Sequence, residues 1–397
     1  MGSEDADIDE LGQVTIEGKK LTWKTNQKGA VGRMQVDEKL IALIKEIEDQ
    51  LSVEVFGTEL IAMLKSCYQK GSTVEQATFL FVNELFKDFG LVILLPDSKS
   101  LKTLFKQTIR KELTEQFSSK AVSKTIDAFP AEYKVQAGGR DLNLFYLNDH
   151  MRERIEAVAG KFVIANTDIS FTSDEIMSEL ESFPERFSPN VITRPLYQET
   201  ILPNVAFIGG GAELAYWLEL KQVFKEAGLA FPVLVLRNSF MVLTMKTIDK
   251  IEALELSPKD FFEEQSRILG KLVAKRSTAK LSLENEKQKL TSLYSQIKDV
   301  SKAADTTLER HVEALCIQAL HRITLLEKKL LKVEKRKFET EKRQISNIKT
   351  VLFPNSTLQE RVDNILPYYA KYGPGFLRSI YDSSSGLDMR FCLLSVK

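Results

Sequence analysis

The segment that follows Ser257 constrains the fold more than any other part of this 397-residue sequence. No proline occurs between Pro258 and Pro354, and apolar residues recur there at steps of three and four among charged side chains. This periodicity predicts an α-helical coiled coil. The small and polar residues of Ser301–Thr307 predict the turn of an antiparallel hairpin. Its second arm, from about Thr306 to Thr350, would extend roughly 65 Å at the rise of an α-helix.

Both ends of this segment carry helix-boundary signals. Ser257 and Pro258 suit the N-cap and the first position of a helix, and Pro354 cannot continue one. Ser356–Gln359 has the pattern of a capping box, which predicts a new helix after it. The closing Met389–Val396 run predicts a final strand.

The residues before Ser257 alternate short apolar runs with amphipathic stretches, which is the pattern of an α/β fold. We expect Ser72 to open the last of three helices, with Glu75 three residues on. Gly90–Pro96 is an unbroken apolar run, typical of a strand buried on both faces of a parallel sheet. The other predicted elements are a hairpin at Gln13–Thr25 turning at Gly18, helices at Asp37–Leu51, Thr58–Lys70 and Thr73–Asp88, a hairpin at Tyr133–Leu147 around Gly138 and Gly139, and a β element at Lys161–Phe171.

The charge and cysteine usage exclude several classes of protein. Lys plus Arg and Asp plus Glu each number 55, so the formal net charge is zero, which argues against nucleic acid as the main partner. The longest apolar runs are too short to span a bilayer, and no secretory leader pattern opens the sequence. Cys67, Cys316 and Cys392 lie far apart without zinc-site spacing. We therefore expect a cytoplasmic, multi-domain protein with reduced thiols and neither a cysteine-based zinc site nor a His-rich metal site.

A glycine-rich loop is the most informative local feature. The apolar run Val205–Ile208 leads into Gly209, Gly210 and Gly211, then into an amphipathic helix that ends near Gly228. A second apolar run, Pro232–Leu236, completes a βαβ unit, whose glycines let backbone N–H groups approach an anion. The loop is neither the dinucleotide fingerprint nor a Walker A loop. Glu213 in the first helical turn would repel a phosphate and suits an amine or a hydroxyl-rich ligand; the alternative is a tight turn without a ligand.

Polar side chains cluster on either side of this unit. Arg194, Arg237, Asn238 and Ser239 lie at or near predicted strand ends, where open α/β sheets bind their ligands. An arginine there would grip a carboxylate or phosphate with two hydrogen bonds. The alternative for Arg194 is a surface ion pair. No Ser–His–Asp or Cys–His arrangement is recognisable, so the catalytic residues stay unassigned.

Two charge clusters have a functional and a simpler interpretation. The first ten residues include Glu4, Asp5, Asp7, Asp9 and Glu10, which either bind Mg²⁺ or are only solvated. The basic end of the predicted second arm, Lys328 to Arg343, either contacts RNA or forms the solvated face of a coiled coil.

Several blocks of sequence, in one order, resemble the bacillithiol synthases, the cysteine-adding ligases (BshC) of bacterial bacillithiol biosynthesis. The similarity runs essentially from residue 1 to 397. The blocks that carry it are Asn143–Leu147, Arg152–Arg154, Ser188–Val191, Arg194–Glu199, Ile208–Gly211 with Glu213, Tyr216 and Trp217, Leu352–Asn355, and Leu358–Arg361.

This resemblance implies a Rossmann-like parallel-sheet core of the nucleotidyltransferase group, with inserted connecting segments. It also implies an antiparallel coiled coil that mediates homodimer formation. The expected domains are a first part of the core at 1–120, a connecting segment with β-hairpins at 121–185, a second part of the core with the glycine loop at 186–256, the coiled coil at 257–350, and a C-terminal segment at 351–397 that packs back on the core.

The reaction implied by the resemblance joins L-cysteine to the amino group of glucosaminyl malate through an amide bond. ATP or ADP is the expected cofactor, with Mg²⁺ as a further possibility. The nucleotide is expected near the glycine loop and the Phe353–Arg361 turn. Expected substrate-binding residues are Arg194, Gln198, Asn204, Glu213, Tyr216, Trp217 and Arg237; expected nucleotide-binding residues are Gly209, Gly210, Gly211, Asn238, Ser239, Phe353, Asn355 and Gln359.

Two features depart from the family pattern. A family stretch with a Gly-Gln-Gln loop has no counterpart here, and Ala6 stands where the family often has His. We therefore expect a truncated chain whose parallel sheet exposes a hydrophobic edge. The alternative function is a catalytically incomplete, nucleotide-binding coiled-coil dimer that acts as a scaffold. A tRNA-handling protein with a coiled-coil arm is a third interpretation, which the zero net charge disfavours.

Overall fold

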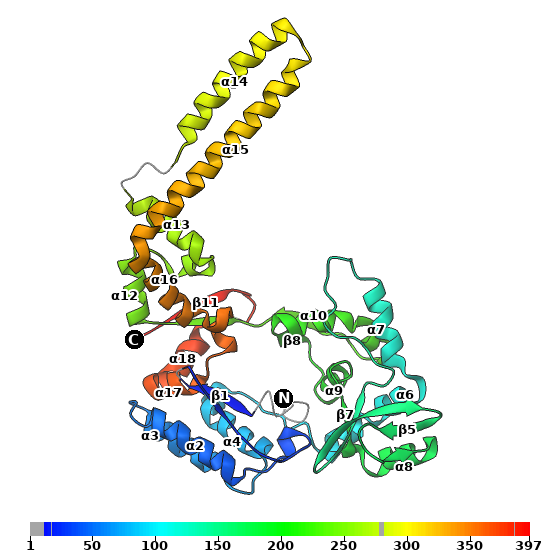
Figure 1. Cartoon of the computed structure of the whole chain (residues 1–397). Coiled ribbons are helices and arrows are strands. Elements are labelled where there is room, and N and C mark those ends of the chain that lie inside the picture. The colour runs from blue at the N-terminus through cyan, green and yellow to red at the C-terminus, as the bar shows by residue number, and fades with distance from the viewer. Residues whose placement is uncertain (1–11, 17, 278–281, 385) are drawn as a thin grey trace. The chain divides into compact units, whose positions relative to one another are not determined.

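The computed structural model describes residues 12–16, 18–277, 282–384 and 386–397 (Figure 1). The chain divides into two compact units, which are described separately. The first comprises Met1–Phe240 with Asp363–Leu394, and the second Met241–Val362 with Ser395–Lys397. The Glu4–Glu10 acidic cluster and Ala6 lie outside the described residues.

The first unit begins with a hairpin and three helices. Strands β1 (Gln13–Ile16) and β2 (Lys19–Thr22) pair antiparallel, as predicted. The short η1 helix (Val31–Arg33) leads to α2 (Glu38–Leu51), α3 (Gly57–Cys67), α4 (Val74–Phe86) and η2 (Lys87–Phe89), so the three predicted helices are confirmed. The predicted N-cap at Ser72 is wrong by one residue, because Thr73 caps α4 and exchanges hydrogen bonds with Gln76.

The prediction of a strand at Gly90–Pro96 is wrong. Residues 91–98 have no regular secondary structure, and the Val92 side chain is 90% exposed. An apolar run becomes a central strand only if strands pair with it on both sides and helices cover both faces. The sequence pattern shows the apolar run, but it does not show whether flanking strands and covering helices are present.

A five-stranded antiparallel sheet with order β6-β5-β4-β3-β7 follows α5 (Lys99–Leu104), α6 (Lys106–Glu115) and α7 (Phe117–Asp127). Its strands are β3 (Leu144–Asn148), β4 (Met151–Val158), β5 (Lys161–Ile164), β6 (Ser170–Phe171) and β7 (Phe187–Pro189), with α8 (Ser173–Ser182) and η3 (Pro184–Arg186) before the last strand. The β element predicted at Lys161–Phe171 is confirmed.

The hairpin predicted around Gly138 and Gly139 is wrong in position. The chain turns between Asn148 and Met151, which pair with each other. The Asn148 side chain accepts a hydrogen bond from the His150 backbone N–H and so stabilises this tight turn. The glycine pair instead lies in a loop whose Gln136 and Ala137 N–H groups donate to Glu219.

The predicted βαβ unit is confirmed. Strands β8 (Ala206–Gly209) and β9 (Val233–Leu236) pair in parallel, and the connection contains two helices, α10 (Gly211–Glu219) and α11 (Lys221–Ala227), where one was expected. Helix α9 (Arg194–Ile201) precedes the unit. Val205 is 88% and Val233 63% exposed, so two apolar side chains of this unit face solvent.

Aromatic packing forms the core beneath this unit. The Phe207 and Trp217 rings stack with centroids 3.9 Å apart, and Phe224 packs against Trp217 at 5.6 Å. These three side chains belong to one buried cluster that also includes Leu144 and Leu196. The cluster therefore joins the parallel strands to the antiparallel sheet and to α9.

In the first unit the C-terminal helix α17 (Ile365–Tyr372) packs beside α3, and α18 (Pro374–Ser383) packs against α17. The Phe56 backbone N–H donates to the Ala370 carbonyl at 2.8 Å. Between the two helices Gly373 has φ 61° and ψ −154°, a conformation almost restricted to glycine. A Cβ atom there would lie 2.7 Å from the Phe56 ring.

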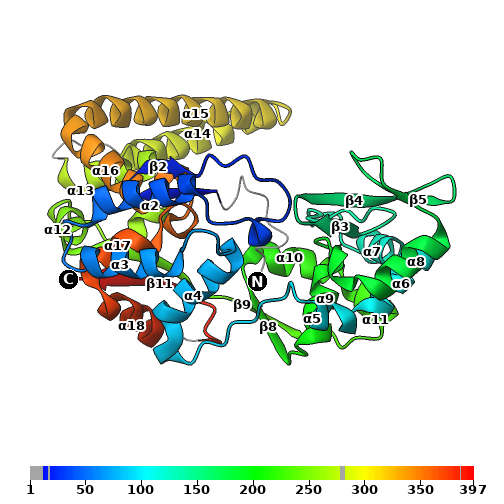
Figure 2. The ribbon, with the colours of Figure 1, turned by 90° about the horizontal axis from the view of Figure 1, so that it is seen from below.

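The second unit contains the helical hairpin (Figures 1 and 2). Helices α14 (Glu284–Ala304) and α15 (Leu308–Lys335) lie side by side and are bridged by Lys287–Glu327 and Lys298–Glu313 ion pairs. The predicted coiled coil and its turn are confirmed. The single second arm to Thr350 is not, because η5 (Arg336–Phe338) interrupts it before α16 (Glu339–Leu352).

Shorter elements complete this unit. They are α12 (Met245–Ala253), η4 (Pro258–Phe262), α13 (Gln265–Arg276), η6 (Pro354–Ser356) and η7 (Gln359–Arg361). The helix predicted directly after Ser356 is wrong, because only 3-10 turns form before Asn364 caps α17. Strands β10 (Ser239–Thr244) and β11 (Phe391–Val396) form a two-stranded sheet, which confirms the closing strand. Within the described ranges, no helix combines the length and apolarity needed to cross a bilayer.

Replacing Gly373 with alanine is expected to destabilise the first unit by about 2–3 kcal/mol, because alanine is strained at this positive φ and its Cβ meets Phe56. Gly375→Ala is the matched control, since no heavy atom lies within 4 Å of a Cβ placed there. Urea unfolding should separate the two variants. Equal stabilities would contradict the conformational argument.

Asp37 should make stability depend on acid pH. Burial raises its pKa, but hydrogen bonds from the Leu40 backbone, Trp23, Thr25 and Gln27 outweigh burial and hold the pKa below its usual value. The stabilisation is therefore fully present above the ordinary aspartate pKa of about 3.9 and is lost as the pH falls through the lower folded-state pKa.

Asp37→Asn should accordingly cost about 1–2 kcal/mol at pH 7 and progressively less in acid. The exposed Asp49→Asn, on the same helix, should leave the unfolding free energy nearly unchanged. A constant Asp37→Asn penalty from pH 7 to pH 2 would refute the carboxylate's role.

Candidate functional site

The glycine loop connects β8 to α10. The Arg237 N–H donates to the Gly209 carbonyl at 2.9 Å and ties the ends of the two parallel strands together. A Cβ atom on Gly209 would lie 2.5 Å from the Phe207 ring. Glycine is needed here because Phe207 folds beneath the loop to stack on Trp217, whereas a Cβ on Gly211 would meet nothing within 4 Å.

Glu213 caps the helix that leaves this loop. Its Oε2 atom accepts a hydrogen bond from the Gly210 N–H at 2.7 Å. The carboxylate therefore occupies the positive end of α10, where an anionic ligand would otherwise bind. This arrangement favours a cationic or hydrogen-bond-donating ligand beside Glu213 over a phosphate at the helix start.

Arg194 and Tyr216, taken from two separate sequence blocks, meet in the structure. The Arg194 guanidinium donates to the Tyr216 hydroxyl at 2.7 Å, and both side chains are half-buried. Arg194 was expected at or near a strand end; it is the first residue of α9, with Thr193 at the N-cap position. The pair places a cation and a phenol beside the loop-bearing helix.

Glu199 forms hydrogen bonds with two other predicted residues. Its buried carboxylate accepts hydrogen bonds from the Asn204 backbone and side-chain N–H groups and from the Gln198 amide. Gln198 and Asn204 therefore hold the connection between α9 and β8. Glu199 could have been recognised in the sequence as a charged residue that falls among the apolar positions of a short helix.

A buried polar network supports the segment before Arg194. Asn143 is fully buried; its N–H donates to Glu112, and its carbonyl accepts from the Thr193 hydroxyl at 2.6 Å. Asn190 donates to the Asn143 side chain and accepts from the Ile192 and Thr193 N–H groups. These bonds fix the turn from which α9 starts.

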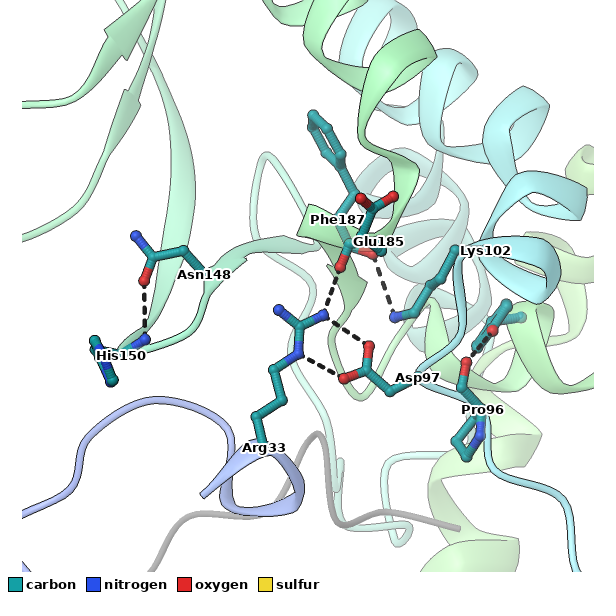
Figure 3. A network of polar contacts seen from close by, with 9 residues as sticks. Arg33, Pro96, Asp97, Lys102, Asn148, His150, Glu185 and Phe187 are labelled. Atoms are coloured by element: carbon teal, nitrogen blue, oxygen red, sulfur yellow. Dashed lines mark hydrogen bonds and ion pairs between the residues drawn. The ribbon is translucent and has the colours of Figure 1, made fainter. Parts of the chain in front are cut away.

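A second network holds the Pro96 region against η3 and β7 (Figure 3). Arg33 donates to both oxygens of Asp97 at 2.6 and 2.8 Å and to the Glu185 carbonyl at 2.8 Å. The fully buried Lys102 donates to the Phe187 carbonyl at 3.3 Å. No motif in the sequence indicated this network, because its members are spread over more than 150 residues.

The remaining predicted residues of the first unit have different surroundings. Trp217 is 1% exposed and packs in the core, so it supports α10 from beneath. Arg237 follows β9 and is exposed, Asn238 accepts a hydrogen bond from the Ser384 hydroxyl at 2.9 Å, and Ser239 begins β10.

The second unit brings Phe353 and Asn355 to one open hollow of about 640 Å³. Phe353 packs edge-on against Phe262 at 5.1 Å, and the Lys349 ammonium lies 5.6 Å from its ring. Gln359 is placed differently: it is buried and bonds the N–H and carbonyl of Val242, which joins η7 to β10. Among the described residues, no group of three or more His, Cys, Asp or Glu could hold a metal ion.

Comparison with known proteins covers both units. The family model described as "Bacillithiol biosynthesis BshC, N-terminal Rossmann-like domain" matches residues 1–238, and that of its "C-terminal coiled-coil domain" matches residues 240–396. These matches agree with the parallel β8–β9 unit and the α14–α15 hairpin, and the predicted fold class is confirmed.

Curated relatives carry the name "Putative cysteine ligase BshC". That of Christiangramia forsetii is 38% identical over 400 residues, covering 100% of this chain and 74% of the relative. That of Flavobacterium johnsoniae is 36% identical with the same coverage, and that of Bacillus pumilus is 27% identical over 96% of this chain and 73% of the relative. The chain therefore belongs to the BshC family of bacillithiol biosynthesis.

Proposed function

We propose that this chain is a cytoplasmic ligase that joins L-cysteine to the amino group of glucosaminyl malate in an amide bond. Family membership supports the reaction class. The observation that carries the proposal is the grouping of Glu213, Arg194 and Tyr216 around the helix that follows the glycine loop. This grouping offers one anionic and one cationic contact, which suits an amine substrate that also bears carboxylates.

Amide formation requires an activated carboxylate and an amine with a free lone pair. In our proposal Glu213 holds the substrate amine, while Arg194 pairs the malate carboxylates and Arg237 pairs an anionic group at the end of β9. Bound ATP would supply the activation of the cysteine carboxylate. The C–N bond of the amide would then form as the amine nitrogen loses a proton and the activating group leaves the carboxyl carbon. Gln198, Asn204 and Trp217 act by positioning, through Glu199 and the aromatic core.

We place the nucleotide contacts at two separate positions. In the first unit, Gly209–Gly211, Asn238 and Ser239 would contact the sugar of the nucleotide, because Glu213 disfavours a phosphate at the start of α10. Phe353 and Asn355 in the second unit offer a ring face and an amide, and Lys349 adds a positive charge beside them. Mg²⁺ would accompany the nucleotide phosphates. Gln359 contributes by holding η7 against β10.

The hairpin is the proposed homodimer interface. Ile317, Leu326 and Val333 on α15 and Val300 on α14 are at least half exposed. Apolar side chains on a paired helical hairpin gain stability when a second copy covers them.

Complementation tests the function. The chain should restore bacillithiol in a bacillithiol-producing host that lacks its own synthase, with the thiol quantified by mass spectrometry. Accumulated glucosaminyl malate beside soluble, folded protein would refute the ligase activity and favour the scaffold interpretation.

Glu213→Gln tests the site within the same assay. Glutamine can still accept the hydrogen bond from Gly210, so the fold should persist while the charge that holds the amine is lost. We expect at least about a tenfold fall in bacillithiol formation, the size of one charge-assisted hydrogen bond. Glu226→Gln, at an exposed position on α11, is the matched control. Equal activities would place the amine elsewhere.

Lys349→Ala tests the second nucleotide position. We expect ADP affinity, measured by titration calorimetry, to fall about tenfold through loss of the cation. Lys342→Ala on the same helix should leave it within about twofold, since Lys342 pairs with Glu339. Unchanged ADP binding by Lys349→Ala would remove this hollow from the proposal.

A further inference from the structure

The first unit contains a cavity of about 570 Å³ that lies apart from the glycine loop and Arg194. Residues of β1, α2, α3, α4, α17 and the Ile93–Pro96 segment line it. Most of the lining is aliphatic or aromatic. Its volume is in the range of pockets that bind small molecules.

Glu75 is the one carboxylate among the described residues that line this cavity. It lies in the first turn of α4, which Thr73 and Gln76 already cap. Its Oε1 atom is buried and has no hydrogen-bond partner within the described ranges. A buried carboxylate oxygen without a hydrogen bond is unfavourable, so Oε1 of this half-buried residue favours binding a donor.

The charges around Glu75 indicate which donor fits. Asp97 and Arg33 both interact electrostatically with Glu75, but Arg33 already gives Asp97 two hydrogen bonds (Figure 3). Lys102 also acts on Glu75 through space, while its ammonium donates to the Phe187 carbonyl. Asp97 is thus compensated directly, whereas the Glu75 carboxylate has no hydrogen-bonded cation in the described part of the chain.

The partial burial of Glu75 also favours a bound cation. It raises the pKa of this carboxyl group, and the neighbouring Asp97 raises it further, while Arg33 and Lys102 lower it. A cation bound inside the cavity would offset this cost of holding the charged form away from water.

We propose that this cavity is a binding site for a small aliphatic amine, with the protonated amine on Glu75 and the hydrocarbon body against the Leu, Ile and Val side chains. Leu43, Ile44, Leu64 and Val82 supply the apolar walls, and Thr78 lies one helical turn from Glu75. The site is separate from the proposed ligase site, and neither proposal depends on the other.

Titration calorimetry with the full chain and three eight-carbon probes tests the head group. n-Octylamine should bind saturably, 1-octanol more weakly, and octanoate at least about tenfold more weakly than the amine, because a second carboxylate would face Glu75. Binding should show a negative heat-capacity change from burial of the chain. Absence of saturable octylamine binding, or octanol or octanoate binding as tightly as octylamine, would overturn the proposal.

Two variants and one control variant test where the probe binds. Glu75→Gln should weaken octylamine about tenfold and remove its advantage over octanoate, while Glu38→Gln, an exposed glutamate in the first turn of α2, should change neither. Val82→Phe should fill the cavity and weaken octylamine and octanol together. Circular dichroism and urea unfolding check that each variant is folded. Unchanged octylamine affinity in folded Glu75→Gln would show that the amine binds elsewhere.

Discussion

The buried carboxylate of Glu112 is the interaction on which the loop-bearing half of the first unit depends. It accepts hydrogen bonds from the Ser118 N–H and hydroxyl and from the Asn143 N–H. Burial of an unsatisfied carboxylate would cost several kcal/mol, so α6, the start of α7 and the start of β3 must keep their relative positions. The Asn143 carbonyl accepts a hydrogen bond from the Thr193 hydroxyl. The position of Thr193, which directly precedes Arg194, is therefore constrained as well.

The glycine loop must satisfy a packing requirement and a hydrogen-bonding requirement with the same few residues. Phe207 must pass beneath the loop to stack on Trp217, which excludes a side chain at Gly209. The start of α10 must also have its N–H groups satisfied, which Glu213 does for Gly210. The same carboxylate that caps the helix places a negative charge where an anion would otherwise bind, which is the basis of the amine contact in the proposed function.

Local sequence patterns predicted the elements whose stabilising contacts are close in sequence. The β1–β2 hairpin, the first three helices, the βαβ unit and the turn between α14 and α15 follow from periodicity, capping residues and glycine placement. Gly90–Pro96 and the glycine pair at 138 and 139 were mispredicted, because their conformations depend on partners far along the chain. Pro96 accepts from the Tyr197 hydroxyl, and Gln136 donates to Glu219.

For the candidate site, the glycine loop, the glutamate in the following helical turn, the family and the coiled coil could all be predicted from the sequence, since each depends on residue types at fixed short spacings. Four further features became apparent from the folded chain alone: Arg194 contacts Tyr216, Trp217 is buried, Gln359 bonds backbone groups, and Glu75 lines a cavity. These outcomes depend on which distant segments exclude water from a side chain. Burial and hydrogen-bond pairing are properties of the packed chain, and no local pattern encodes them.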